Sequence, residues 1–237
     1  MMIPVLIVLC EGQTEDRFVH DVLAPFLRAR GIVVKSRILV TSKKKNVRGG
    51  LIHYAQVKRD LNILFGEFSD NATEKYWFTT MFDYYALPDD FPGFGEKIAD
   101  PYQRVQHLED ALKQDMGYYR LLPYIQLHEF EALVLSNPDY LLDEYPNSKE
   151  AVQVLKKSVE EKKGNPELVN GNVSTAPSKR IFKALSACNY SYNKKKVGPE
   201  VAGKIGMEKL MEECKHFGEW VEKLCYLGNS EEKMDLY

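Results

Sequence analysis

The fold is decided by residues 3–16, Ile-Pro-Val-Leu-Ile-Val-Leu-Cys-Glu-Gly-Gln-Thr-Glu-Asp, an apolar run that stops at Glu11 and Glu15. An unbroken aliphatic run of this length is typical of a strand buried on both faces, as in a parallel sheet. Gly12 permits a tight turn after it, so Glu11 is expected at the carboxyl edge of the strand. Ligands of open α/β sheets bind at that edge, which makes Glu11 a candidate site residue. The alternative is that Glu11 and Glu15 are solvated loop acids.

Strand and helix patterns alternate four times in the first 136 residues. Thr14 is expected to cap a helix whose apolar stripe ends at Leu27. This alternation predicts an α/β fold with right-handed crossovers, in which a parallel sheet of about four strands is flanked by helices. The expected strands are 3–10, 32–40, 76–82 and 121–127, and the helices between and after them include 54–64, 101–116 and one opening at His128.

The remainder of the chain reads as mainly helical. Helices are expected at 149–163, 178–187, 200–213 and 216–227, with a loop at 164–176. We therefore expect an α/β domain over residues 1–145 and a helical C-terminal extension over 146–237 that packs on it.

Composition is that of an ordinary globular protein: 237 residues, 44% hydrophobic and 28% charged, with a net charge of −2. No apolar stretch approaches the roughly 20 residues that cross a bilayer, and the start lacks a leader pattern, so we expect a cytoplasmic protein without membrane contact. The four cysteines have no paired spacing. Cys214 and His216 lie close together, but a core thiol is favoured there over a metal ligand.

Charge is segregated along the chain. Residues 82–116 hold eight acids and three bases, whereas residues 177–204 hold seven bases and one acid. One region is suited to cations and the other to anions, which is what metal-dependent work on a phosphate backbone requires. The alternative is that both regions are solvated helix faces.

Carboxylates follow three of the expected strands. Glu11, Asp83 and Glu129 should converge because parallel strands deliver their carboxyl ends to one edge, and Glu15 lies one helical turn beyond Glu11. We prefer Glu129, because it is nearer the strand end than Glu131, and we keep Glu131 as the alternative. Hard oxygen ligands without a cysteine or histidine cage suit Mg²⁺ or Mn²⁺. The chemistry implied is metal-assisted phosphoryl transfer or phosphodiester hydrolysis.

His128 offers a proton carrier beside these acids, although a histidine at a strand end is more often a structural hydrogen-bonding group. Tyr84 and Tyr85 are expected either to stack on bases or to pack their own loop. The basic loop 42–48 suits phosphate contact, with a solvated loop as the alternative.

Five motifs together resemble a known family. They are Cys-Glu-Gly-Gln-Thr-Glu-Asp at 10–16, Asp-Tyr-Tyr-Ala-Leu-Pro at 83–88, His-Glu-Phe-Glu-Ala-Leu at 128–133, Ala-Pro-Ser-Lys-Arg-Ile at 176–181 and His-Phe-Gly-Glu-Trp-Val at 216–221. The first two resemble the Toprim domain of topoisomerases, primases and OLD-type nucleases. All five, covering nearly the whole chain, resemble one bacterial Toprim-type family of unknown function that is often encoded beside ATPases in phage-defence loci.

The resemblance implies roles for individual residues. Glu11 matches the Toprim glutamate, Glu15 a second metal ligand of OLD-type enzymes, and Asp83 the first acid of an Asp-x-Asp pair. Tyr85 stands where the second acid is expected, so Asp89, Asp90, Glu129 or Glu131 would have to complete the shell, or the site binds metal weakly. A lysine near the scissile phosphate is also implied, for which Lys179, Arg180 and Lys194 are candidates, and Ser178 would cap a helix facing that phosphate; the alternative is an exposed basic helix start.

The sequence and the resemblance together predict a Mg²⁺- or Mn²⁺-dependent nuclease acting on DNA or RNA with an ATPase partner. The alternatives are a catalytically inactive nucleic-acid-binding or regulatory subunit and a nucleotide or RNA phosphotransferase. The expected catalytic residues are Glu11, Asp83, Lys179 and Lys194; the expected metal ligands are Glu11, Glu15, Asp83, Glu129 and Glu131; the expected nucleic-acid contacts are Lys43, Lys44, Lys45, Arg48, Lys179 and Arg180.

Overall fold

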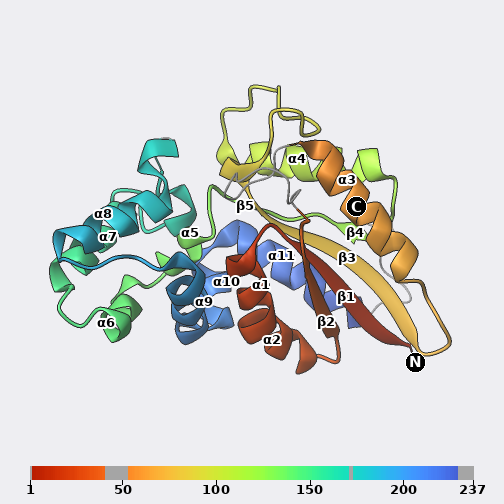
Figure 1. The fold of residues 1–237 in the computed structure, drawn as a ribbon, viewed down its shortest axis with the longest axis horizontal. Helices are drawn as coiled ribbons and strands as arrows, with labels where there is room; N and C mark the ends of the chain where they lie inside the picture. Colours follow the sequence, from red (N-terminus) through yellow and green to blue (C-terminus); the bar gives the residue numbers. More distant parts are fainter. Residues whose placement is uncertain (1, 41–52, 171–172, 229–237) are drawn as a thin grey trace.

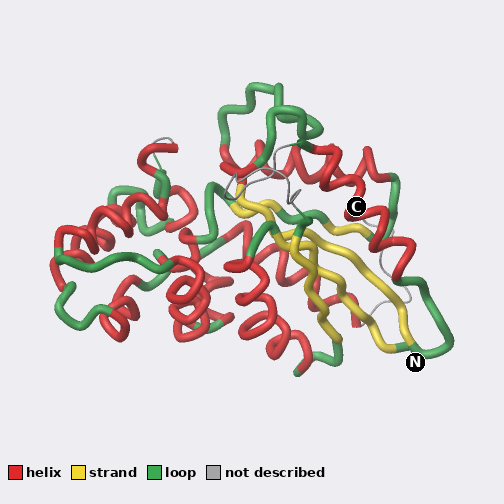
Figure 2. The backbone as a smooth tube through the Cα atoms, viewed as in Figure 1, coloured by secondary structure: helices red, strands yellow, loops and turns green. Residues whose placement is uncertain are grey.

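A parallel sheet forms the centre of the computed structural model, which describes residues 2–40, 53–170 and 173–228 (Figure 2). Its strands within these ranges are β1 (Ile3–Cys10), β2 (Val33–Ile38), β3 (Glu74–Asp83), β4 (Leu121–Leu122) and β5 (Ile125–Gln126). They lie in the order β2-β1-β3-β4, and β5 also pairs with β3, all in parallel. The predicted α/β fold with a parallel sheet flanked by helices is confirmed.

Helices cover both faces of the sheet (Figure 1). On one face Leu6, Val8 and Cys10 of β1 pack with helices α1 (Gln13–Phe18), α2 (Ala24–Arg28) and α11 (Lys215–Cys225). On the other, Val5, Ile7 and Leu9 pack with α3 (Tyr54–Glu67) and α4 (Pro101–Met116). The first strand is an unbroken apolar run because it is buried on both sides: alternate residues point to opposite faces of the sheet and enter the two cores in turn.

The first helix differs from its prediction at its start. Gly12, not Thr14, is the N-cap residue, and its N–H donates to Glu15 Oε2 at 3.0 Å. A π-helical turn, Val19–Leu23, joins α1 to α2. The helix predicted at 101–116 is confirmed as α4: Asp100 Oδ1 accepts from the N–H of Gln103 at 2.9 Å at its start, and Gly117 ends the helix with a φ of 61°.

The fourth predicted strand is broken in two. Pro123 separates β4 from β5, and Thr80 replaces the missing ladder bonds: its Oγ1 accepts from the N–H of Tyr124 and donates to the Tyr124 carbonyl, both at 2.9 Å. His128 then takes a left-handed conformation, φ 66°, so the helix expected to open there is delayed to one short turn, α5 (Glu131–Val134).

The C-terminal region contributes no strand within its described residues. Its helices are α6 (Leu141–Glu144), α7 (Lys149–Glu160), α8 (Pro177–Ala187), α9 (Lys194–Ile205), α10 (Met207–Glu213) and α11. The helix predicted at 200–213 starts earlier than expected and is broken at Gly206, whose φ is 85°. Part of this region packs on the sheet, since Val197 of α9 and Trp220 of α11 share the core of β1.

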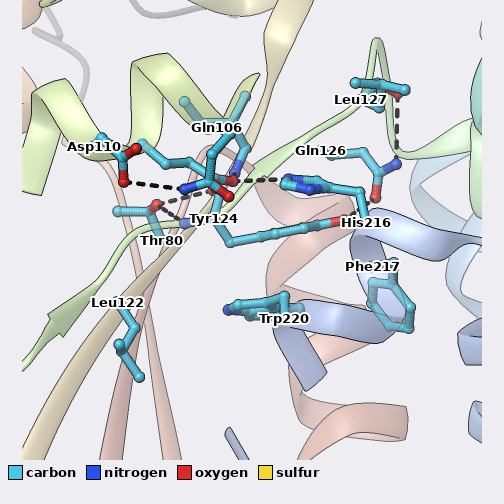
Figure 3. Close-up of polar contacts among 12 residues, drawn as sticks. Thr80, Gln106, Asp110, Leu122, Tyr124, Gln126, Leu127, His216, Phe217 and Trp220 are labelled. Atoms are coloured by element: carbon cyan, nitrogen blue, oxygen red, sulfur yellow. Dashed lines mark hydrogen bonds and ion pairs between the residues drawn. The ribbon is translucent and has the colours of Figure 1, made fainter. Parts of the chain in front are cut away.

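Buried polar and aromatic contacts connect α11 to the sheet edge formed by β4 and β5. Figure 3 shows Tyr124 between His216 and Trp220, with ring centroids 5.3 Å and 4.2 Å away. His216 Nε2 lies 2.8 Å from Glu109 Oε1 of α4. Buried Glu167 accepts from the N–H groups of His216 and Phe217 at 3.0 Å and 3.1 Å, so a carboxylate occupies the amino end of α11. His216 therefore serves a structural contact between α4 and α11.

Candidate functional site

The topology places a switch point between the carboxyl ends of β1 and β3. The chain leaves β1 for β2 through helices on one face and reaches β3 through α3 on the other, so the connections diverge at the β1–β3 pair. Such a switch point is where open α/β sheets bind ligands. Glu11 follows β1 and Asp83 ends β3, and Glu11 Oε2 accepts from the N–H of Asp83 at 3.1 Å. The two acids expected to converge lie side by side.

Three further carboxylates surround this pair. Glu15 comes from the first turn of α1 and is buried. Glu131 comes from α5 and is fully buried, and half-buried Glu129 precedes it. Burial, followed by the charge of Glu15, is the main cause of the raised pKa values of Glu11 and Asp83; Glu129 adds a smaller contribution at Glu11, and Glu131 adds one at Asp83. A choice between Glu129 and Glu131 is needed only if a helix has already begun at Glu129, and α5 begins at Glu131.

Backbone and side-chain donors orient these acids. Asp83 Oδ1 accepts from the N–H of Phe130 at 2.8 Å, which ties the end of β3 to the start of α5. Glu129 Oε2 accepts from the N–H of Ser178 at 2.9 Å, and Glu131 Oε1 accepts from the hydroxyl of Tyr192 at 3.5 Å. We name Glu11, Glu15, Asp83, Glu129 and Glu131 the acid cluster.

Lys194, the first residue of α9, is the basic side chain that acts on the acid cluster. Its Nζ lies 3.8 Å from Glu131 Oε2. Burial alone would lower the pKa of Lys194, but Glu131, Asp83, Glu15 and Glu129 together raise it above its ordinary value. Lys194 therefore stays protonated beside the carboxylates.

The carboxyl pKa values show how strongly the acids disfavour full ionisation. Burial first, then the charge of Glu15, raises the pKa of Glu11 from 4.5 to about 7. Burial raises the pKa of Glu131 to about 7, and it raises the pKa values of Glu15 and Asp83 as well. Several acids that cannot all ionise at neutral pH form a site that a cation would stabilise.

The donor set fits a hard divalent cation. All five side chains offer carboxylate oxygens, the ligands preferred by Mg²⁺ and Mn²⁺. Glu131 Oε2 is buried without a hydrogen-bond partner, so one oxygen remains open to a ligand. In the described part of the chain, no three acidic, histidine or cysteine side chains are already arranged to hold a metal ion. A cation would therefore have to draw the oxygens together.

His128 is placed as a structural group. It is buried, its ring stacks on Tyr85 with centroids 5.3 Å apart, and its Nδ1 lies 3.3 Å from Asn170 Nδ2. Burial, then Arg104 and Lys162, lowers the pKa of His128 to about 4. A histidine that is neutral at pH 7 has no proton to donate as imidazolium. Tyr85 also contacts Asn170, and Tyr84 packs on Phe94 with centroids 6.1 Å apart, so these tyrosines pack their loop.

Two of the remaining predicted contacts, Lys179 and Arg180, lie near the start of α8. Lys179 is exposed on α8, and Arg180 Nε donates to the Thr175 carbonyl at 2.8 Å. Ser178 does not cap α8, which begins at Pro177 after Ala176. The basic residues Lys43, Lys44, Lys45 and Arg48 fall outside the described residues.

Asp89 and Asp90 are exposed on the loop after β3. Asp90 Oδ1 accepts from the N–H of Tyr54 at 2.8 Å, at the start of α3, and so is engaged away from the acid cluster. Cys214, judged a core thiol, is buried, and burial raises its pKa.

Tyr192 and Tyr145 are the site residues that sequence reasoning missed. Tyr192 contacts Glu131, and Tyr145 holds the segment before α9: its hydroxyl donates to the Ser191 carbonyl at 3.2 Å and accepts from the N–H of Asn193 at 3.3 Å. Neither tyrosine stands in a strand-end pattern. The signal available was the segment Tyr-Ser-Tyr-Asn-Lys at 190–194, which places aromatic hydroxyls next to a lysine.

The fold and site together define a class of protein: an α/β protein with a carboxylate cluster at the switch point of a parallel sheet. No curated protein matches the chain, and no solved structure does. A family model does match, over residues 10–225, and the chain belongs to that family, the Domain of unknown function (DUF4276). Among the described helices, none is long and apolar enough to cross a membrane.

Proposed function

We propose that the protein is a Mg²⁺- or Mn²⁺-dependent phosphodiesterase of Toprim type that cleaves nucleic acid. The observation that carries the proposal is the meeting of Glu11, Asp83 and Glu131, from three separate chain segments, with Lys194 beside them. Carboxylates hold the cation, and an ammonium group is suited to the substrate phosphate. An ATPase partner is proposed from the resemblance alone.

Each residue of the acid cluster has a role in this proposal. Glu11 and Asp83 would hold the cation, with Glu15, Glu129 and Glu131 as further ligands. When bound, a cation of this kind activates a water and neutralises charge on the leaving oxygen. The Phe130 N–H fixes Asp83, and the Tyr192 hydroxyl fixes Glu131, so both carboxylates are oriented before substrate arrives. Tyr85 stands where the second acid of the Asp-x-Asp pair is expected, and Glu131 would supply the carboxylate that is missing there.

Cleavage by the Glu11→Gln variant tests the proposal. Wild type should cleave supercoiled DNA, single-stranded DNA or RNA when Mn²⁺ or Mg²⁺ is added, and Glu11→Gln should lose this activity because the amide is a poorer ligand. Circular dichroism should show an unchanged fold. Exposed Glu161, changed to Gln, is the matched control and should cleave like wild type. Undiminished cleavage by Glu11→Gln would remove Glu11 from the mechanism.

A second candidate function is an inactive regulatory or nucleic-acid-binding subunit. Two observations favour it: Tyr85 replaces an expected acid, and the described side chains form no ready-made metal cage. Calorimetric titration of Mn²⁺ into wild type and Asp83→Ala separates the two functions. We expect binding by wild type and loss of binding in Asp83→Ala; a wild type that binds neither Mn²⁺ nor Mg²⁺ would favour the inactive subunit.

A further inference from the structure

The position of Lys194 is unfavourable for a lysine in an isolated helix. The first turn of α9 holds Lys194, Lys195 and Lys196 and no acid, and cations at a helix amino end are opposed by the helix dipole. Lys195 is exposed, and Lys196 Nζ reaches Glu144 Oε2 at 3.5 Å. Lys194 alone of these three contacts the acid cluster, whose charge offsets the dipole.

The backbone that carries Lys194 is firmly held. Asn193 Oδ1 caps α9 by accepting from the N–H of Lys196 at 3.3 Å. Two glycines seat the helix closely: a Cβ at Gly198 would lie 3.2 Å from Phe130, and one at Gly203 would lie 3.2 Å from Val22. Any movement of the ammonium group must therefore come from the side chain.

The side chain itself is loosely held. Its Nζ is 3.8 Å from Glu131 Oε2, which is beyond hydrogen-bond length, and that oxygen has no hydrogen-bond partner. The lysine side chain is 42% exposed, whereas the Glu131 side chain is 0% exposed. The lysine side chain is thus in contact with solvent, whereas the carboxylate is not.

We propose, resting on the proposed function, that Lys194 is a displaceable internal cation of the acid cluster. Without a divalent ion its ammonium group occupies the side of the cluster next to Glu131. When a divalent ion enters, Lys194 turns outward and its ammonium binds a phosphate of the nucleic-acid strand. Metal and lysine therefore compete for the same carboxylates, and metal binding prepares the phosphate contact.

Competition makes a prediction opposite to that for a simple structural lysine. Removing the ammonium should strengthen divalent-cation binding, on the order of tenfold or more, because one positive charge no longer opposes the incoming ion. The same substitution should weaken binding of a nucleic-acid strand, because a phosphate contact is lost. A lysine that only supports the fold would change both affinities in the same direction.

The experiment measures both affinities in the full chain. Mn²⁺ is titrated calorimetrically into wild type, Lys194→Gln and Lys195→Gln, the last removing the same charge from the next residue. A fluorescent single-stranded DNA oligonucleotide is then titrated into each protein with Ca²⁺ present. We expect Lys194→Gln to bind Mn²⁺ more tightly and the oligonucleotide more weakly than wild type, and Lys195→Gln to match wild type in its Mn²⁺ affinity.

A second measurement on wild type does not depend on a variant folding. Reductive methylation of Lys194, followed by mass spectrometry of peptides, should become faster when Mg²⁺ saturates the protein, because the ammonium leaves the carboxylates. Lys195 is the internal reference and should react at the same rate with and without Mg²⁺.

The outcomes separate this inference from the proposed function. Mn²⁺ binding by wild type that is equal or weaker in Lys194→Gln would overturn the displaceable cation and leave the metal site standing. A Lys194 methylation rate unaffected by Mg²⁺, in a wild type shown to bind the ion, would do the same. Absence of Mn²⁺ binding by all three proteins would overturn both.

Discussion

Glu131 is a carboxylate whose surroundings differ strongly from water. Its side chain is fully buried, and its nearest basic group is Lys194 at 3.8 Å. Burial raises the pKa of Glu131 to about 7, and that of Glu11 is raised to the same region. Without a divalent ion, the folded protein therefore holds protons that the unfolded chain releases between pH 4.5 and about 7.

This proton uptake predicts how stability depends on pH. Because the folded state binds more protons than the unfolded state in that window, the free energy of unfolding should fall as pH rises through it, by up to about 1.4 kcal/mol per pH unit for each such carboxyl group. Glu131→Gln should reduce the slope and be more stable than wild type at pH 8. Urea unfolding in chelator at pH 5, 6, 7 and 8 measures this.

Glu161→Gln is the control for the pH experiment, since Glu161 is exposed and outside the acid cluster. Its slope should equal that of wild type. A Glu131→Gln slope as steep as that of wild type would mean that Glu131 ionises normally, contrary to the burial described above.

Helices α10 and α11 pack so closely that their contact requires a glycine at one position. A Cβ on Gly218 of α11 would lie 2.5 Å from the backbone oxygen of Met211, which cannot rotate away as a side chain would. We expect Gly218→Ala to lower the free energy of unfolding by about 1–3 kcal/mol because the two helices must separate.

Gly66 supplies the matched control for this substitution. It lies in α3, is exposed, and a Cβ there would meet nothing within 4 Å. Gly66→Ala should raise the free energy of unfolding by roughly 0.5–1 kcal/mol through helix propensity alone. Urea unfolding of both variants tests the pair; equal effects would show that the α10–α11 contact tolerates a methyl group.

The sequence predicts elements well where a single local signal decides them. The strand at 3–10 and the helix at 101–116 are seen as predicted. Errors arise where tertiary contacts override local pattern. Pro123 breaks the fourth strand, Thr80 bonds to Tyr124 in place of the ladder, and the left-handed His128 delays α5. Neither the contact of Tyr124 with Thr80 nor the φ of His128 is encoded within a few residues of the break.

At the scale of the whole molecule, the topology explains which part of the site was predictable. Glu11 and Asp83 follow strands, so parallel pairing alone brings them together. Lys194 and Tyr192 reach the same place from a segment without strands, through the packing of α9 on α1 and α5. The resemblance names Lys194 as one of three candidates, but placing Lys194 and Tyr192 beside the acids from the sequence pattern would have required the helix packing itself, which periodicity does not specify.

The shared core predicts the behaviour of a fragment. Residues 1–145, taken as the expected α/β domain, lack α9 and α11, which cover the Leu6 and Val8 face of β1. A fragment 1–145 should expose that face, bind a hydrophobic dye and unfold without a sharp transition, in contrast to the full chain. Dye fluorescence and thermal melting test this; a cooperative melt of the fragment would show that the domain folds alone.

The interruption at Pro123 also affects whether copies of the protein can associate by extending the sheet. The sheet edge at β4 and β5 offers only two short segments to a strand from another molecule. The backbone N–H and carbonyl of Tyr124 between them are already hydrogen-bonded to Thr80. Among the described residues, that edge offers only two short strands for sheet extension, whereas the outer edge of β2 is six residues long. Aggregation by strand addition should therefore begin at β2, although the positive charges of Lys35 and Arg37 oppose the addition of a strand there.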